Sequence, residues 1–259
     1  MQNNQNPILN IIQITDTHVF SDSQQTVFDV NTTQQFHHAI EQIKRDPKQP
    51  DLIFLTGDIA HDETREAYQM VAETLSSLGR PIYWIPGNHD NPSFMSEVFD
   101  QYFLFHKEKV FHFDAWTFIF INTKYGASDA GYFNDTDKDV IEAEMTHCDS
   151  QRNVCIVMHH NPIAVGTPLM DQTMIQNNEE FWRCIKQYDQ IKHIICGHVH
   201  NSYRICHDGV TIESSLATCF QIPKGATELD IAFNIGYKRH AVFDNQITSH
   251  SINIENIVC

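Results

Sequence analysis

Five short polar groups in this chain each follow an apolar run of strand length, and their side chains are of types that bind metal ions or move protons. A single group of this kind is most often a turn, because Gly, Asn and Asp tolerate unusual backbone angles. Histidine has no such preference, and five groups at the same end of successive strands indicate one chemical site. The groups are DTH at 16–18, GD at 57–58, GNHD at 87–90, HHNP at 159–162 and GHVH at 197–200.

Seven of these side chains are candidate metal ligands. In an extended chain, residues two apart point to the same side, so the two members of the DTH group should converge, as should the two histidines of GHVH. Seven ligands are too many for one four-coordinate ion with an open position and too few for two ions unless one carboxylate is shared. Two ions that share a carboxylate are suited to in-line displacement at phosphorus. The candidate ligands are Asp16, His18, Asp58, Asn88, His159, His198 and His200.

The apolar runs that precede these groups predict strands covered on both faces, because they are nearly continuous rather than alternating. Segments with helical spacing lie between them at 32–45 and 63–78, and Gly79 with Pro81 ends the second. Alternating strands and helices predict an α/β fold whose strand ends meet at a ligand-binding edge. The predicted strands are 8–15, 51–56, 81–85, 154–158 and 191–196.

Other stretches predict antiparallel pairs, so we expect a mixed sheet or two packed sheets flanked by helices. No linker, repeat or low-complexity segment divides the chain, which predicts a single domain over residues 1–259. The irregular stretch 161–178 is long enough to be a functional loop. The antiparallel pairs are expected at 110–122, 203–213 and 237–254, with turns near Asp114, Asp208-Gly209 and Asp244-Asn245.

The composition argues against several classes of partner. The chain has 259 residues with 33 acidic and 17 basic side chains, a formal net charge of −16, and no Lys/Arg cluster that would bind a nucleic acid. Solubility alone explains the charge equally well. The absence of a long apolar run and of a secretory N-terminal pattern predicts no membrane association and a cytoplasmic location. The seven Cys residues form no C-x-x-C pair, and we expect them to be reduced core residues.

The five motifs together carry a resemblance. The order D-x-H, G-D-x-x-x-D, G-N-H-D, H-H-x-P and G-H-x-H, which covers residues 16 to 200, resembles the calcineurin-like metallophosphoesterases. This resemblance implies a four-layer αββα sandwich with two mixed β-sheets. The phrases TGDIAHD, PIYWIPGNHDN, CGHVH, SSLATCFQIP and IGYKRHAVF are most similar to the bacterial class III 3′,5′-cyclic AMP phosphodiesterases.

The resemblance implies two metal ions with Asp58 as the bridging ligand. Iron, manganese, zinc and cobalt all suit these ligands, so the sequence leaves the metal open. The resemblance also implies that His18, Asn88, His89 and His200 face the substrate phosphate. One ion would be held by Asp16, His18, Asp58 and His200, and the other by Asp58, Asn88, His159 and His198.

His89 matches the family's catalytic histidine that does not bind metal. In some members a carboxylate three positions after the bridging Asp orients this histidine, but here that position is His61. Asp62 lies one position later, so Asp62 is the expected partner of His89.

The resemblance implies a dinuclear phosphodiesterase that converts 3′,5′-cyclic AMP to 5′-AMP through attack by a metal-bridging hydroxide, with protonated His89 assisting the leaving 3′-oxygen. The alternative is an enzyme for another small phosphoester, namely a phosphomonoester, a 2′,3′-cyclic nucleotide or a nucleotide-sugar diphosphate. A non-catalytic binding scaffold would be expected to lack ligands, whereas all seven are present. Base contacts are expected from 161–178 and 219–223, and the sequence leaves monomer and homodimer open.

Overall fold

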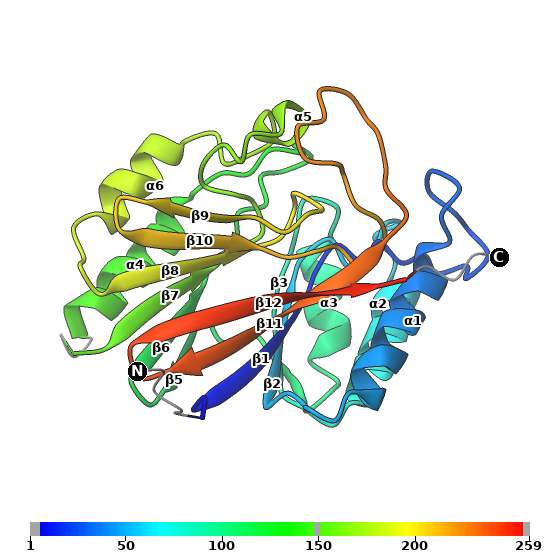
Figure 1. Cartoon of the computed structure of the whole chain (residues 1–259), viewed down its shortest axis with the longest axis horizontal. Coiled ribbons are helices and arrows are strands. Elements are labelled where there is room, and N and C mark those ends of the chain that lie inside the picture. The colour runs from blue at the N-terminus through cyan, green and yellow to red at the C-terminus, as the bar shows by residue number, and fades with distance from the viewer. Residues whose placement is uncertain (1–5, 148–150, 256–259) are drawn as a thin grey trace.

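Two six-stranded mixed sheets pack face to face in the computed structural model, which describes residues 6–147 and 151–255 (Figure 1). Helices cover the outer face of each sheet, so the described residues form the expected four layers, helix, sheet, sheet and helix. No helix in these two ranges is both long and apolar enough to cross a lipid bilayer.

The first sheet places three of the ligand-bearing strands side by side. Three strands run parallel, namely β1 (Leu9–Ile14), β2 (Leu52–Thr56) and β3 (Ile82–Ile85). Strand β11 (Ile235–Phe243) joins the sheet antiparallel to β1. Helices α1 (Thr32–Arg45), α2 (Arg65–Ser76) and α3 (Pro92–Phe99) pack on its outer face. In spatial order its strands are β12 (Gln246–Ile254), β11 (Ile235–Phe243), β1 (Leu9–Ile14), β2 (Leu52–Thr56), β3 (Ile82–Ile85) and β4 (Phe105–His106).

The second sheet holds the other two ligand-bearing strands, β7 (Asn153–Val157) and β8 (Ile191–Cys196), which are parallel neighbours. Helices α4 (Asp135–His147) and α6 (Asn178–Ile185) cover it, and the short α5 (Pro168–Asp171) lies in the loop between β7 and α6. In spatial order its strands are β5 (Val110–Phe113), β6 (Trp116–Phe120), β7 (Asn153–Val157), β8 (Ile191–Cys196), β10 (Val210–Ser214) and β9 (Arg204–His207).

Aromatic rings hold the two sheets together. Phe54 of β2 makes edge-to-face contacts with Phe118 and Phe120 of β6, at ring-centroid distances of 5.4 and 5.1 Å. Such contacts add to the free energy gained by burying the rings, because the positive edge of one ring meets the negative face of the other. This packing helps to fix the position of each sheet relative to the other, and therefore the relative positions of the strand ends.

Local sequence explains the first helix. Asn31 caps α1 by accepting a hydrogen bond from the Gln34 N–H at 2.9 Å, and Lys44 and Arg45 occupy its last turn, where cations interact favourably with the helix dipole. Phe36, together with Ala39, Ile40 and Ile43, forms the buried stripe against the sheet. The predicted range 32–45 is confirmed without change.

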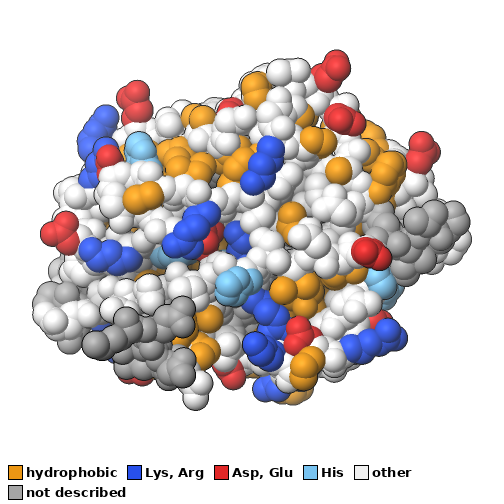
Figure 2. Space-filling model, viewed as in Figure 1, with side chains coloured by type: hydrophobic (Ala, Val, Ile, Leu, Met, Phe, Trp, Pro, Cys, Tyr) orange, Lys and Arg blue, Asp and Glu red, His pale blue; other side chains and the backbone are white. Residues whose placement is uncertain are grey.

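The predicted strands, the hairpins and the helix predicted at 63–78 are confirmed to within a few residues, whereas strand β4 and helices α3, α4, α5 and α6 were not predicted. The expectation for cysteine is confirmed at Cys155, Cys184, Cys196 and Cys219, which are buried free thiols, and is wrong for Cys206, which is exposed. Cys148 and Cys259 lie outside the described residues. The face shown in Figure 2 mixes basic and acidic side chains rather than gathering one sign of charge.

Candidate metal centre

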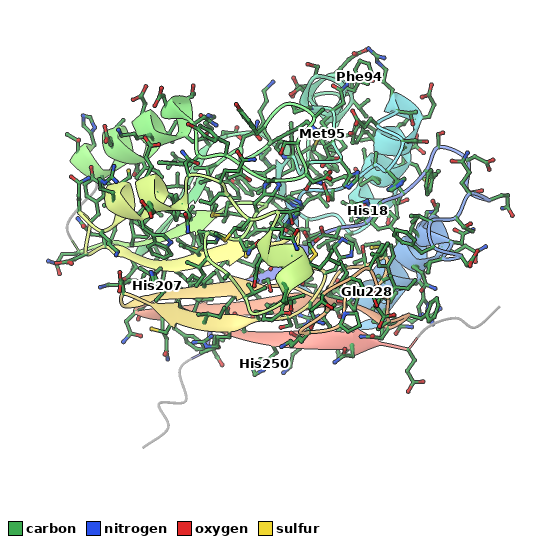
Figure 3. The ribbon with its side chains drawn as sticks, turned by 90° about the horizontal axis from the view of Figure 1, so that it is seen from above. His18, Phe94, Met95, His207, Glu228 and His250 are labelled. Atoms are coloured by element: carbon green, nitrogen blue, oxygen red, sulfur yellow. The ribbon has the colours of Figure 1, made fainter. Side chains whose placement is uncertain are left out.

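The seven candidate ligands lie together where five strands end. Asp16 and His18 follow β1, Asp58 follows β2, and Asn88 follows β3. His159 follows β7, and the remaining two histidines, His198 and His200, follow β8. None of the seven side chains is more than 8% exposed. In Figure 3, seen from above, the label of His18 lies well inside the outline of the molecule.

One group of ligand atoms surrounds His18. Its Nε2 lies 3.3 Å from the Nε2 of His200 and 3.6 Å from Oδ2 of Asp58. Oδ1 of Asp16 lies 3.5 Å from the same His200 nitrogen. These four side chains are the set that the family resemblance assigns to one ion.

A second group surrounds Asn88. Its Oδ1 lies 3.1 Å from Nε2 of His159 and 3.1 Å from Nδ1 of His198. Nε2 of His159 is also 3.4 Å from Oδ2 of Asp58. The same Asp58 oxygen therefore contacts both groups, which is the position that a bridging carboxylate needs.

The residues fit a pair of cations. Oδ1 of Asp16 is buried, and no hydrogen-bond donor among the described residues reaches it. Buried acceptors of this kind normally have a partner, and a cation would supply one. The donor set combines carboxylate, amide and imidazole without thiolate, which suits divalent or trivalent transition metals.

Two of the ligand imidazoles are held by backbone carbonyl groups on their outer side. Nδ1 of His159 donates to the Thr56 carbonyl at 2.7 Å, and Nδ1 of His200 to the Phe220 carbonyl at 3.1 Å. Each bond fixes the tautomer and leaves the other ring nitrogen as an acceptor toward the centre.

Side chains hold the other two imidazoles. Nε2 of His198 lies 2.8 Å from the Thr173 hydroxyl oxygen, and Nδ1 of His18 lies 3.2 Å from Nδ1 of His61. Neither Thr173 nor His61 was assigned a role from the sequence. Thr173 lies in the stretch 161–178, which the sequence marked as a functional loop, whereas His61 was noted only because it replaces a carboxylate.

The backbone at the centre is unusual, and it corrects the sequence-based reason for convergence. The pairs at 16 and 18 and at 198 and 200 were expected to converge because the chain is extended, but all four residues have a left-handed backbone. Non-glycine residues pay for this conformation in free energy, and such strain is concentrated at functional sites. The left-handed candidate ligands are Asp16 (φ 52°), His18 (φ 45°), Asp58 (φ 52°), His198 (φ 66°) and His200 (φ 44°).

Burial and close packing shift the pKa values of several of these side chains. Burial opposes charge on Asp58, but nearby His159, His18 and His89 hold the pKa of its carboxyl well below the usual value. Burial likewise opposes charge on His159, yet Asp58 raises its pKa to about 9, so an ion that binds His159 must displace a proton from it. Burial lowers the pKa of His18 well below its usual value, which keeps this imidazole neutral, as a metal ligand must be.

Asp90 is a residue whose role the sequence reasoning missed. Its Oδ1 accepts the N–H groups of Ile59 and Ala60 at 2.9 and 3.2 Å, and its Oδ2 accepts that of Gly87 at 2.9 Å. Burial, followed by repulsion from Asp58, raises the pKa of Asp90 to about 6. Asp90 thus connects the loop after β2 to the loop after β3. The sequence feature that could have revealed this role is the position of Asp90 as the last residue of the GNHD motif.

His89 lies beside the centre and is only partly buried. Its backbone N–H donates to Oδ1 of Asp58 at 2.8 Å, while its ring stacks on His61 at a centroid distance of 5.4 Å. The expected partner, Asp62, accepts hydrogen bonds from Ser21 and Thr64 instead. No hydrogen bond within the described ranges joins Asp62 to His89, so an orienting role for Asp62 stays a prediction.

A cavity of about 290 Å³ opens onto the centre. His18, Asp58, Asn88 and the two histidines after β8 form its polar floor, and His61 and His89 also line it. Its size is near the lower end of small-molecule sites. The arrangement can therefore bring a small anionic ester against two bound cations.

Comparison with known proteins identifies the family. The model of the calcineurin-like phosphoesterase family matches residues 9–202. A probable cyclic nucleotide phosphodiesterase of Coxiella burnetii is 35% identical over 80% of this chain and 83% of its own length. The 3′,5′-cyclic adenosine monophosphate phosphodiesterase CpdA of Vibrio vulnificus is 30% identical over 82% of this chain and 77% of its own length.

Solved structures agree on the fold. The crystal structure of a dimetal phosphatase from Danio rerio has a TM-score of 0.69 and 13% sequence identity, and the match covers 96% of this chain and 99% of that one. GAP50, the anchor in the inner membrane complex of Plasmodium, has a TM-score of 0.63 at 13% identity, over 96% and 89% of the two chains. With the sequence match over residues 9–202, these findings show that the chain belongs to the calcineurin-like phosphoesterase family.

Proposed function

We propose that this protein hydrolyses 3′,5′-cyclic AMP to 5′-AMP at the centre described above. The observation that carries the proposal is the position of Asp58, whose Oδ2 contacts both ligand groups, at 3.6 Å from His18 and 3.4 Å from His159. Members of this family are phosphoester hydrolases that depend on two metal ions. The names of the relatives at 35% and 30% identity support a cyclic nucleotide as the substrate.

Each group of side chains would hold one ion, with iron, manganese, zinc and cobalt as the candidate metals. When bound, two such cations lower the pKa of water and neutralise the charge that develops on phosphoryl oxygens. The ions would be held by Asp16, His18, Asp58 and His200 on one side and by Asp58, Asn88, His159 and His198 on the other.

The side chains at the floor of the cavity would bind the phosphate. The Asn88 amide and the rings of His18 and His200 line the cavity beside His89 and would face the phosphoryl oxygens. The backbone N–H of His89 is fixed by Asp58, which holds the His89 ring at the edge of the centre. A group in this position can bind the phosphate and deliver a proton.

His89 would act as the general acid. An alkoxide such as the ribose 3′-oxygen is a poor leaving group, so a positioned proton donor lowers the barrier to breaking its bond to phosphorus. The His89 ring contacts the rings of His18 and His61 and still reaches the cavity. These contacts restrict the ring without using it as a ligand in either group.

Size and charge favour a small substrate. The cavity of about 290 Å³ admits one nucleotide-sized ester, and the formal charge of −16 repels long polyanions. A cyclic nucleotide carries only a single negative charge. Cations in the floor of the cavity would attract that charge locally.

The test is a substrate comparison on one metal-loaded preparation. We expect two ions per chain by elemental analysis and a higher kcat/KM for 3′,5′-cyclic AMP than for 2′,3′-cyclic AMP or p-nitrophenyl phosphate. In ¹⁸O water, the label should enter the phosphate of 5′-AMP. A wide advantage for p-nitrophenyl phosphate would reject the cyclic nucleotide as substrate and leave the family assignment intact.

A pair of variants tests the metal centre itself. Asp58→Ala should lose metal and activity together, because both groups share this carboxylate. Asp139→Asn, an exposed carboxylate of α4, is the matched control and should keep both. Two tightly bound ions in Asp58→Ala would contradict the proposed bridge.

A further inference from the structure

A tight turn at the mouth of the cavity has an unexpected residue at its tip. Val27 and Val30 pair through two backbone hydrogen bonds of 3.0 Å, and only Phe28 and Asp29 lie between them. Both of these residues have a left-handed backbone, with φ of 52° and 61°. This is the geometry of a type I′ turn, which strongly favours Asn, Asp and Gly.

Phe28 is costly at this position for two reasons. A residue with a Cβ in the left-handed region loses about 1–2 kcal/mol relative to the right-handed region. The Phe28 ring is also 46% exposed, so it gains only part of the free energy that burial would give. Phe28 therefore combines a strained backbone with an exposed apolar ring at the edge of a site, and this combination indicates a role in binding.

The ring of Phe28 continues an aromatic surface that starts at the metal centre. Phe28 meets Phe220 edge to face at a centroid distance of 5.6 Å. Phe220 in turn packs on the rings of His200 at 4.9 Å and His18 at 6.3 Å. Both phenylalanines line the cavity, so the aromatic surface runs from the centre to its mouth.

Most of the other residues that line the cavity away from the floor are aliphatic, and Asp129 and Thr173 are the polar exceptions. Loop contacts hold this wall in place, since Leu169 N–H donates to the Ala226 carbonyl at 3.0 Å and Gly225 N–H donates to the Thr167 hydroxyl at 2.9 Å. A cavity with a polar floor and an apolar aromatic wall complements a ligand with an anionic end and a flat apolar end. The aliphatic side chains of the wall are Val27, Leu169, Met170, Ile222 and Leu229.

We propose that Phe28, with Phe220 beside it, forms the surface on which the base of the nucleotide stacks. This inference rests on the proposed function, which supplies the nucleotide. The sequence pointed to 219–223 and 161–178 for base contacts, and these segments contribute Phe220 and Leu169 to the wall. Phe28 lies in neither segment. Removing an aromatic ring on which a base stacks typically weakens binding by about 5-fold to 100-fold.

The experiment compares three variants of Phe28 in the metal-loaded protein. Phe28→Ala removes the ring, Phe28→Trp keeps an aromatic ring, and Phe28→Asn puts a residue preferred by the turn in its place. Phe103→Ala is the matched control, because Phe103 is 89% exposed and does not line the cavity. The substrates are 3′,5′-cyclic AMP and methyl riboside 3′,5′-cyclic phosphate, which has the same cyclic ester and no base.

We expect Phe28→Ala to raise KM for cyclic AMP on the order of 10-fold. Its effect on the base-free ester should be clearly smaller, Phe28→Trp should recover most of the loss, and Phe103→Ala should match the wild type. Phe28→Asn should raise KM for cyclic AMP as well, while its melting temperature rises by about 2–4 °C because the turn is relieved of strain.

Two kinds of result would overturn the inference. A higher melting temperature in Phe28→Asn with an unchanged KM, or equal losses for the two substrates in Phe28→Ala, would show that the ring does not bind the base. Wild-type protein that is active on other phosphoesters but not on cyclic AMP would instead reject the proposed function, and the base surface with it. The wild-type measurement therefore separates the two failures.

Discussion

The hydroxyl oxygen of Thr173 lies 2.8 Å from Nε2 of His198, on the opposite side of the imidazole from Asn88. The other nitrogen of that ring, Nδ1, is 3.1 Å from the Asn88 amide oxygen. Thr173 therefore restrains the ring so that Nδ1 points into the second ligand group. A hydrogen bond of this kind at the outer nitrogen orients a metal-binding imidazole and increases its basicity.

Replacing Thr173 by Val, which has nearly the same shape, should weaken the binding of one metal ion by about 10-fold to 100-fold. The reason is that His198 loses the partner that orients it, while the first ligand group is untouched. Calorimetric titration of the metal-free protein with Mn²⁺ measures both affinities. Thr173→Ser keeps the hydroxyl and should bind both ions as the wild type does. If Thr173→Val binds both ions with unchanged affinity, the hydroxyl does not position His198.

Gly87 is placed where any side chain would displace the shared carboxylate. A Cβ on Gly87 would lie 2.2 Å from Oδ1 of Asp58 and 2.4 Å from its backbone nitrogen. Gly87→Ala should therefore move Asp58 and release both ions, as measured by elemental analysis after dialysis. Gly79→Ala is the control, because Gly79 has a φ of 63° and open space around its Cα. That variant should lose about 1 kcal/mol of stability and keep its metal.

His89→Ala should keep both ions and lower kcat for cyclic AMP by about 10²-fold to 10⁴-fold, the usual contribution of a positioned acid. The loss should be smaller for bis(p-nitrophenyl) phosphate, since p-nitrophenolate needs little help from a proton. Steady-state kinetics on the two substrates, with elemental analysis of the same samples, makes the comparison. His250→Ala, at an exposed position of β12 that Figure 3 shows well away from His18, is the control. Equal losses on both substrates would mean that His89 mainly binds phosphate.

The sequence predicts the positions of the metal ligands better than it predicts the residues that hold those ligands by hydrogen bonds. The five strand ends were identifiable because each is a run of apolar residues followed directly by polar ones. The hydrogen-bond partners of the imidazoles were not identifiable in this way. Thr173 is 25 residues from His198, and no local sequence pattern indicates that the two are in contact. Such a contact exists only once the loop between β7 and α6 has folded over the end of β8.

The sequence also failed to predict the left-handed backbone at the centre and the presence of helix α4. Nothing in the letters DTH requires a left-handed backbone at Asp16, because Asp and His adopt other conformations more readily. Helix α4 was missed because only Asp137, Ile141 and Met145 of its described residues are buried, which gives a weak apolar stripe. Local propensity carried too little information at both places, and tertiary packing decided the outcome.

A buried charged cluster between the sheets is predicted to make stability depend on pH. Glu213 of β10 accepts hydrogen bonds from His193, Arg204 and Ser249. In the same cluster, Nδ1 of His240 lies 2.8 Å from the Ser249 hydroxyl oxygen. Although the Glu213 carboxylate is near, burial lowers the pKa of His240 to about 3. His240 is therefore neutral in the folded protein throughout the range in which an unfolded histidine takes up a proton.

The sign of the effect follows from proton binding. Below the ordinary histidine pKa of about 6.5, the unfolded chain binds a proton at position 240 and the folded protein does not, so acidification favours unfolding. His240→Gln can keep hydrogen bonds to Ser249 and Gln13 but cannot titrate. Between pH 7 and pH 5, the free energy of unfolding should fall by about 2 kcal/mol more in the wild type than in His240→Gln. Urea denaturation across this range, with His250→Gln as the surface control, makes the measurement, and parallel pH profiles for the wild type and His240→Gln would contradict the lowered pKa.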